Sequence, residues 1–307
     1  MAMEAPRPFF LPPAPAVATS PGNGVEEPVV ARIPTGVPDF DYLTGGVPSG
    51  SVVLLIGEAG AGHQEFALTS AVHLMLHYDD PKLHRFYLGN AKGPFVYPSG
   101  VVYVSVSRSQ EQVLREVRGA FESTYRDVLL RHLVFHDLSP TYFADSVVPS
   151  TWSSLTSPLL SGAQTETKES PDALRALADA VENSGPSNLV LVDSLTDLLV
   201  RRGIDSDELL ALIKGLRRRA KDWNGIVYLL LSKGVAPSAT EQAIIDSVDG
   251  VLSFGWISSP HHSFRQRVML IEKFMPVLAH VRHEHQGRFV IQVSSVSGLV
   301  TTQYERI

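Results

Sequence analysis

This sequence of 307 residues contains no cysteine, which excludes disulfide bonds, thiolate metal sites and cysteine nucleophiles. It also lacks any apolar run that approaches the roughly 20 residues of a membrane-spanning helix. Phe9, Phe10 and Leu11 are apolar, but prolines at positions 12, 13 and 15 break this stretch as a signal-peptide core. These absences predict a soluble, cytoplasmic protein with no membrane span.

Positive charge is also scarce, because 26 Lys and Arg residues face 32 Asp and Glu residues and give a formal net charge of −6. This balance argues against a general nucleic-acid-binding protein. One stretch is locally basic, with Arg201, Arg202, Lys214, Arg217, Arg218, Arg219 and Lys221. An exposed helical face explains it most simply, followed by a subunit contact and then by nucleic acid. No aromatic side chains for base stacking are interleaved with these charges.

Short apolar segments alternate with amphipathic ones along the chain, a pattern typical of a mostly parallel α/β sheet with helices on both faces. Toward the carboxyl end no long helix is expected, and the sheet should continue as an antiparallel extension. The expected helices are residues 65–78, 110–125, 171–183, 205–223 and 240–247. The expected strands are residues 52–56, 101–106, 133–135, 188–192, 225–231 and 250–254, then 267–272, 278–282 and 288–293 in the extension.

Two segments differ in composition from this alternating pattern. Residues 1–28 are rich in Pro, Ala and Gly and predict a disordered tail before a single domain over residues 29–307. Residues 139–170 are rich in Ser, Thr and Pro and predict a mobile insert, since connections of that length are unusual in a compact domain. Residues 79–99 are expected to be a loop, with an inserted hairpin as an alternative.

The expected first strand leads into a glycine-rich loop with the G-x-x-x-x-G spacing of a phosphate-binding loop. Its residues are Gly57, Glu58, Ala59, Gly60, Ala61, Gly62, His63 and Gln64. Such glycines let backbone N–H groups surround a phosphate at a helix N-terminus. A lysine and a Ser or Thr normally follow the last glycine, to hold phosphate charge and Mg²⁺. Here His63 and Gln64 replace both, so ATP or ADP is a conceivable ligand and Mg²⁺ a doubtful one.

Asp193 ends the expected fourth strand, at the same sheet edge as the glycine-rich loop. It could hold Mg²⁺ through water or cap the turn that follows, and the two alternatives carry equal weight. The loop itself could bind nucleotide or serve only as a tight turn, with binding slightly favoured because three glycines persist. Zinc is conceivable but poorly supported at a loose histidine cluster, namely His261, His262, His280, His283 and His285.

Residues 33–43 (IPTGVPDFDYL) and 45–50 (GGVPSG) resemble the opening of KaiC-like domains in the RecA superfamily. Residues 189–196 (LVLVDSLT) are similar to the Walker B strand of that family. Residues 267–273 (RVMLIEK) resemble its late strand, and the resemblance covers residues 31–297. A second resemblance, to the archaeal HTR-like branch, comes from residues 137–152. The family likeness implies a RecA-like P-loop fold that binds and hydrolyses ATP, with Lys273 directed at a neighbouring subunit's nucleotide.

Several positions depart from the pattern of that family. His63 and Gln64 replace the lysine and hydroxyl of the phosphate loop. Ser107 and Arg108 stand where the family carries a Glu-Glu pair that includes the catalytic base. Of the late Lys-x-Arg pair only Lys273 remains. These joint losses indicate a degenerate catalytic site.

Three hypotheses follow from this combination of resemblance and departure. The first is a pseudo-ATPase, a nucleotide- or anion-binding regulatory protein that acts through a protein partner or self-association. The second is a slow but genuine ATPase in a signalling or motor ring. The third is a purely structural RecA-like module.

Overall fold

The computed structural model describes residues 31–91, 93–144, 146–153, 172–258, 265–278 and 287–306. The expected tail of residues 1–28 and the five clustered histidines lie outside these ranges. The helices are α1 (Pro38–Thr44), α2 (His63–Asp79), α3 (Pro81–Leu88), α4 (Gln110–Ala120), α5 (Ser123–His132), α6 (Ser139–Phe143), α7 (Ser150–Ser153), α8 (Ala173–Ser184), α9 (Leu195–Val200), α10 (Ser206–Ala220), α11 (Ser238–Ser247) and α12 (Met275–Leu278). The strands are β1 (Arg32–Ile33), β2 (Val47–Pro48), β3 (Ser51–Gly57), β4 (Val101–Ser105), β5 (Leu133–Asp137), β6 (Leu189–Asp193), β7 (Ile226–Ser232), β8 (Gly250–Ser258), β9 (Arg265–Phe274), β10 (Gly287–Ser294) and β11 (Gly298–Arg306).

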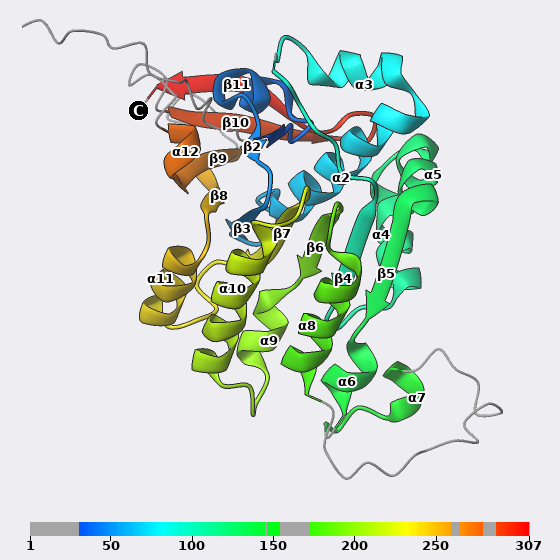
Figure 1. The fold of residues 1–307 in the computed structure, drawn as a ribbon, viewed down its shortest axis with the longest axis vertical. Coiled ribbons are helices and arrows are strands. Elements are labelled where there is room, and N and C mark those ends of the chain that lie inside the picture. Colours follow the sequence, from blue (N-terminus) through cyan, green and yellow to red (C-terminus); the bar gives the residue numbers. More distant parts are fainter. Residues whose placement is uncertain are drawn as a thin grey trace, which may run out of the picture. The chain divides into compact units, whose positions relative to one another are not determined.

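Within the described residues, nine strands form one sheet in the order β11-β10-β9-β8-β3-β7-β6-β4-β5 (Figure 1). The six strands from β8 to β5 run parallel to one another, whereas β9, β10 and β11 extend the sheet from β8 in antiparallel pairs. The predicted mostly parallel sheet with an antiparallel extension is therefore confirmed. The strand β3 lies between β7 and β8, so the loop that follows it leaves from the interior of the sheet.

Alternating residues of the parallel strands face two separate apolar layers, as the period of two in a β-strand requires. In β3, Val53 and Leu55 pack with α1–α5, while Val52, Leu54 and Ile56 pack with α8–α11. The prediction of helices on both faces is confirmed. Every residue of β3 is buried, which explains why this strand reads as a continuous apolar run rather than an alternating one.

Several sequence expectations about individual elements were wrong. Residues 79–99, expected to be a loop or a hairpin, include α3, and Asp80 caps that helix by accepting from the backbone N–H groups of Lys82 and Leu83. The helix expected over residues 110–125 is two helices, because Phe121 and Glu122 adopt extended backbone angles between α4 and α5. The strands β1, β2 and β11 and the helices α1 and α9 were not expected.

Two further expectations fall partly outside the described residues. Of the strand expected over 278–282, Leu278 ends α12, and the remaining residues are not described. Of the insert expected over 139–170, residues 139–143 form α6 and residues 150–153 form α7. Residues 154–170 of this insert lie outside the described part of the chain.

Candidate functional site

The glycine-rich loop lies between β3 and α2, at the edge where the parallel strands end. Gly60 and Gly62 have φ angles of 70° and 117°, in a region that favours glycine. The first helical hydrogen bond of α2 runs from the N–H of Phe66 to the carbonyl of Gly62, and no side chain caps this end. The N–H groups of the first helical turn therefore have no intrahelical acceptor, which is the arrangement that binds phosphate at helix N-termini.

His63, at the position of the usual lysine, turns toward the base of the loop. A Cβ atom added to Gly57 would lie 2.5 Å from His63 Nδ1, so only glycine at 57 leaves room for this ring. Nδ1 is buried without a hydrogen-bond partner, and burial lowers the pKa of His63 below its ordinary value of 6.5. The imidazole is therefore neutral at pH 7 and provides no fixed charge for a phosphate.

Asp193, at the end of β6, is ion-paired with Arg108, which follows β4. The strands β4 and β6 are adjacent and parallel, with Ser105 opposite Asp193, so residues just beyond their ends meet at one edge. Tyr103 Oη donates to Asp193 Oδ2, and Arg108 Nη2 also donates to Tyr103 Oη at 3.1 Å. A second carboxylate, Glu116 on α4, pairs with the other side of the guanidinium. The carboxylate for which Mg²⁺ binding and turn capping were equal alternatives is thus paired with a cation of the chain itself.

Gln64 joins this cluster from the glycine-rich loop. With its amide oriented so that the oxygen faces the guanidinium, Gln64 Oε1 accepts from Arg108 Nη2 at 2.7 Å and from Nη1 at 3.2 Å. Burial opposes the charge of Arg108, but nearby Tyr103 and Asp193 raise the pKa of its guanidinium above the ordinary value. One guanidinium thus connects Gln64 of the glycine-rich loop with the carboxylate at the end of β6.

The sequence identified Arg108 only as a missing base and did not predict its contact with Asp193. The available signal was that both residues lie at the carboxyl ends of strands expected in one parallel sheet, where they could meet if the strands were neighbours. The glycine-rich loop also has neighbours from β8 and β9 that the sequence analysis missed. Trp256 Nε1 donates to the carbonyl of Ala59 at 3.2 Å, and Arg267 Nε donates to the carbonyl of Gly60 at 2.8 Å.

Lys273, the residue expected to reach a neighbouring subunit, binds within its own chain. Its Nζ donates to the carbonyls of Ile245, Asp246 and Val248 at 2.8–2.9 Å, at the end of α11. Burial lowers the pKa of this ammonium group below its ordinary value. A contact with a neighbouring nucleotide stays a prediction, and the conformation seen here uses Lys273 as a helix cap.

Three of the seven basic residues around α10 pair with carboxylates. Asp249 accepts from Arg217 Nε and Lys221 Nζ, each at 2.8 Å, and Arg219 pairs with Glu182 at 2.9 Å. These pairs favour the interpretation as a solvated helical face over a nucleic-acid surface. Within the described ranges, no group of three His, Asp or Glu side chains is arranged to hold a metal ion. None of the described helices has both the length and the apolar character that a membrane crossing requires.

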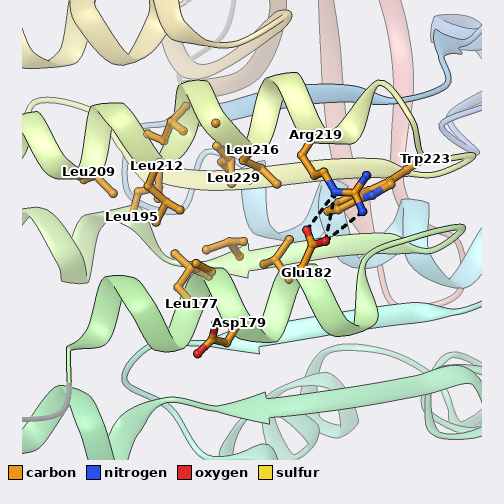
Figure 2. Close-up of a pocket in the computed structure, with 15 residues that line it drawn as sticks. Leu177, Asp179, Glu182, Leu195, Leu209, Leu212, Leu216, Arg219, Trp223 and Leu229 are labelled. Atoms are coloured by element: carbon orange, nitrogen blue, oxygen red, sulfur yellow. Dashed lines mark hydrogen bonds and ion pairs between the residues drawn. The ribbon is translucent and has the colours of Figure 1, made fainter.

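A separate apolar cavity of about 360 Å³ lies between α8 and α10, above β6 and β7. Figure 2 shows leucine side chains of both helices facing each other, with the Glu182–Arg219 ion pair at one end. Its lining includes Leu177, Leu195, Leu209, Leu212, Leu216, Trp223 and Leu229. No residue of the glycine-rich loop lines it, so this cavity is not part of the phosphate-binding candidate.

No model of a known protein family matches the sequence, and no curated protein matches it. Solved structures do share its fold. A KaiC-like protein from the hyperthermophilic archaeon Pyrococcus horikoshii has a TM-score of 0.57 and 18% identity, over 90% of this chain and 100% of the other. The flagellar accessory protein FlaH from Methanocaldococcus jannaschii has a TM-score of 0.59 and 15% identity, with the same coverage. The predicted resemblance is therefore confirmed at the level of the fold, which is RecA-like.

Proposed function

We propose that this chain is a KaiC-like pseudo-ATPase: a regulatory protein that binds a nucleotide or another polyphosphate anion and hydrolyses it little or not at all. The observation that carries this proposal is the Arg108 guanidinium, bound at once to Asp193 and to Gln64 beside an uncapped glycine cradle. The cradle retains the backbone donors that bind phosphate. The site around it has lost the groups that drive hydrolysis.

The loss of hydrolysis follows from three changes that act on the same step. Neutral His63 supplies no charge for the phosphates, and Arg108 competes with Mg²⁺ for Asp193. Neither Ser107 nor Arg108 can accept a proton from water at pH 7. Individual electrostatic and general-base contributions are each worth about 10²-fold or more in rate, so their joint loss leaves little turnover. Binding would then act as a signal, transmitted to a partner protein or to another copy of the chain.

A binding and turnover experiment tests this proposal. Calorimetric titration with ATP and ADP should detect binding, while phosphate release stays far below the roughly 1 s⁻¹ of ordinary enzymes. The matched control is Gly60→Asp, which places a carboxylate in the exposed loop at a φ of 70° that Asp tolerates, and which should abolish binding. Phosphate release near 1 s⁻¹ that Gly60→Asp removes would favour the genuine ATPase. Absence of binding at millimolar ATP would favour the structural module.

A further inference from the structure

The strand pair β8–β9 continues past the end of β3 and lies alongside the glycine-rich loop. Gly57, the last residue of β3, is the register partner of Phe254, so Trp256 lies two residues beyond the end of β3. Trp256 is itself opposite Arg267 on β9. Directly opposed residues of antiparallel strands place their side chains on one face, and so do residues two apart. Arg265, Arg267 and Trp256 therefore share the face that meets the loop.

These three side chains form a compact cluster against the loop. The guanidinium carbons of Arg265 and Arg267 lie 5.1 Å and 4.7 Å from the Trp256 ring centroid, within the range of cation–π attraction. Arg265 also lies 3.8 Å from the carboxylate of Glu58. The backbone N–H of Glu58 donates to the carbonyl of Phe254 at 3.0 Å. Residues of β8 and β9 thus hold Glu58, Ala59 and Gly60 of the loop from one side.

The hydrogen bonds of this cluster go to loop carbonyl groups rather than to loop N–H groups. Trp256 Nε1–H donates a hydrogen bond to the Ala59 carbonyl, and Arg267 Nε–H donates one to the Gly60 carbonyl. Trp256 and Arg267 therefore occupy none of the loop N–H groups, of which those of Glu58 and Ala61 already donate to the carbonyls of Phe254 and Glu58. The arginine therefore lies next to the cradle without using its donors.

Arg267 also carries a charge that no described carboxylate neutralises, since the ion pairs of the described residues include Arg265 with Glu58 but none with Arg267. The loop itself provides no cation, because His63 is neutral. A positive charge on a residue hydrogen-bonded to Gly60 raises the electrostatic potential in the cradle. Coulomb attraction of this kind acts over several ångströms without direct contact.

We propose that Arg267 supplies, from β9 of the same chain, the positive charge that the glycine-rich loop has lost, and that it thereby selects polyphosphate ligands over monophosphates. This inference rests on the proposed function, because it requires an anion in the loop. In this proposal Arg267 acts through its positive charge and not only by holding the loop in position. It therefore predicts that affinity depends on the number of phosphates.

The test compares ATP, ADP and AMP binding by calorimetry in the wild type and in Arg267→Gln, which keeps a hydrogen-bond donor and removes the charge. ATP affinity should fall about tenfold in Arg267→Gln, and AMP affinity less than about threefold, as expected for loss of one screened charge. Arg267→Lys, which keeps the charge, should retain most of the ATP affinity. The control Arg131→Gln removes a charge at the opposite sheet edge, where Arg131 pairs with Asp79. It should leave the affinities for ATP, ADP and AMP unchanged.

A second variant separates charge from loop positioning. Trp256→Phe removes the indole donor to Ala59 but leaves both arginines, so the charge model predicts a smaller loss of ATP affinity than in Arg267→Gln. Equal ATP affinity in wild type and Arg267→Gln would overturn the inference while leaving the proposed function intact. A loss in Arg267→Lys as large as in Arg267→Gln, or equal losses for ATP and AMP, would also overturn it. Absence of ATP binding in the wild type would overturn the proposed function and the inference together.

Discussion

Asp193 has one carboxylate to share between a metal ion and Arg108. The guanidinium is covalently part of the chain and held additionally by Glu116 and Gln64, so its effective concentration at the carboxylate is high. Mg²⁺ dehydrates reluctantly and must displace this partner to bind. At the scale of single residues, the character of the site thus depends on a substitution at 108 as much as on those in the loop.

Removing the Arg108 side chain should free the Asp193 carboxylate to bind a metal ion. In Arg108→Gln we expect ATP to bind about three- to tenfold more tightly with Mg²⁺ than with a chelator, because a freed carboxylate can hold the metal through water. Calorimetric titration in both conditions measures this difference. The control is Arg115→Gln on α4, whose partner is the exposed Glu111. An Arg108→Gln protein with no response to Mg²⁺ would show that Asp193 is a structural residue only.

His73 is a second residue whose surroundings fix its charge. Its Nδ1 lies 2.7 Å from the Gly36 carbonyl, which can only accept, so Nδ1 carries the proton and Nε2 accepts from Tyr125 Oη at 2.6 Å. Burial lowers the pKa of His73 from 6.5 to about 4. The unfolded chain therefore binds a proton between these pH values that the folded chain does not, and stability falls as pH decreases through this window.

This linkage predicts a loss of about 2 kcal/mol of unfolding free energy between pH 7 and pH 5 from His73. Asp41 titrates in the opposite sense, since burial raises its pKa to about 7, so the contribution of His73 must be isolated by difference. Urea unfolding of the wild type and of His73→Gln at both pH values provides that difference. The variant should be less stable at pH 7 but lose less on acidification. Parallel losses in both proteins would assign the pH dependence to other groups.

At the scale of elements, the carboxyl end of α11 is capped by one side chain from the strand β9. Lys273 of β9 binds three of the carbonyls at and just beyond the end of this helix, which have no further helical donor. Hydrogen bonds to charged groups are individually worth about 1.5–3 kcal/mol. The cap also connects β9 to the segment that leads into β8.

Lys273→Ala should therefore lower the unfolding free energy by about 1–3 kcal/mol, because it leaves these carbonyls without their charged donor. Urea unfolding at two protein concentrations measures this loss, and the loss should be the same at both. Lys214→Ala, on the basic face of α10, is the control and should change stability by less than about 0.5 kcal/mol. A Lys273→Ala protein with unchanged stability but weaker ATP binding would instead support the role toward a neighbouring nucleotide.

The elements that the sequence predicted well are those whose local pattern agrees with their place in the sheet. The buried strand β3 and the helix α2 were located because an apolar run, a glycine-rich turn and a helical pattern follow one another. The break at Phe121 was missed because apolar spacing continues on both sides of it. β11 was missed because its place depends on contacts with α2, such as the Leu299 N–H donating to Thr69 Oγ1.

The same distinction applies to the candidate site. The loop from Gly57 to Gln64 was found in the sequence because its spacing is local. The contacts of Arg108 with Asp193, and of Arg267 with Gly60, join residues 85 and 207 positions apart. Such contacts depend on which strands are neighbours in the sheet, and local patterns in one sequence do not reveal that order.

At the scale of the whole molecule, hydrolysis would require several changes at once. His63→Lys should tighten ATP binding by restoring a charge, and Gln64→Thr should add a ligand for Mg²⁺. The double variant should nevertheless release phosphate at a rate close to that of the wild type, because Ser107 and Arg108 still provide no base. A phosphate-release assay checks this expectation. Turnover near 1 s⁻¹ in the double variant would mean that the base lies elsewhere in the chain.

We expect a guanidinium of the chain itself to stand in for the metal ion beside the phosphate cradle. Calorimetric titration of the wild type with ATP, once with excess Mg²⁺ and once with a chelator, tests it most directly. We expect binding in both conditions with dissociation constants that agree within about threefold, a difference below 1 kcal/mol. Tightening by tenfold or more when Mg²⁺ is present would contradict it, because the metal would then have displaced Arg108 from Asp193.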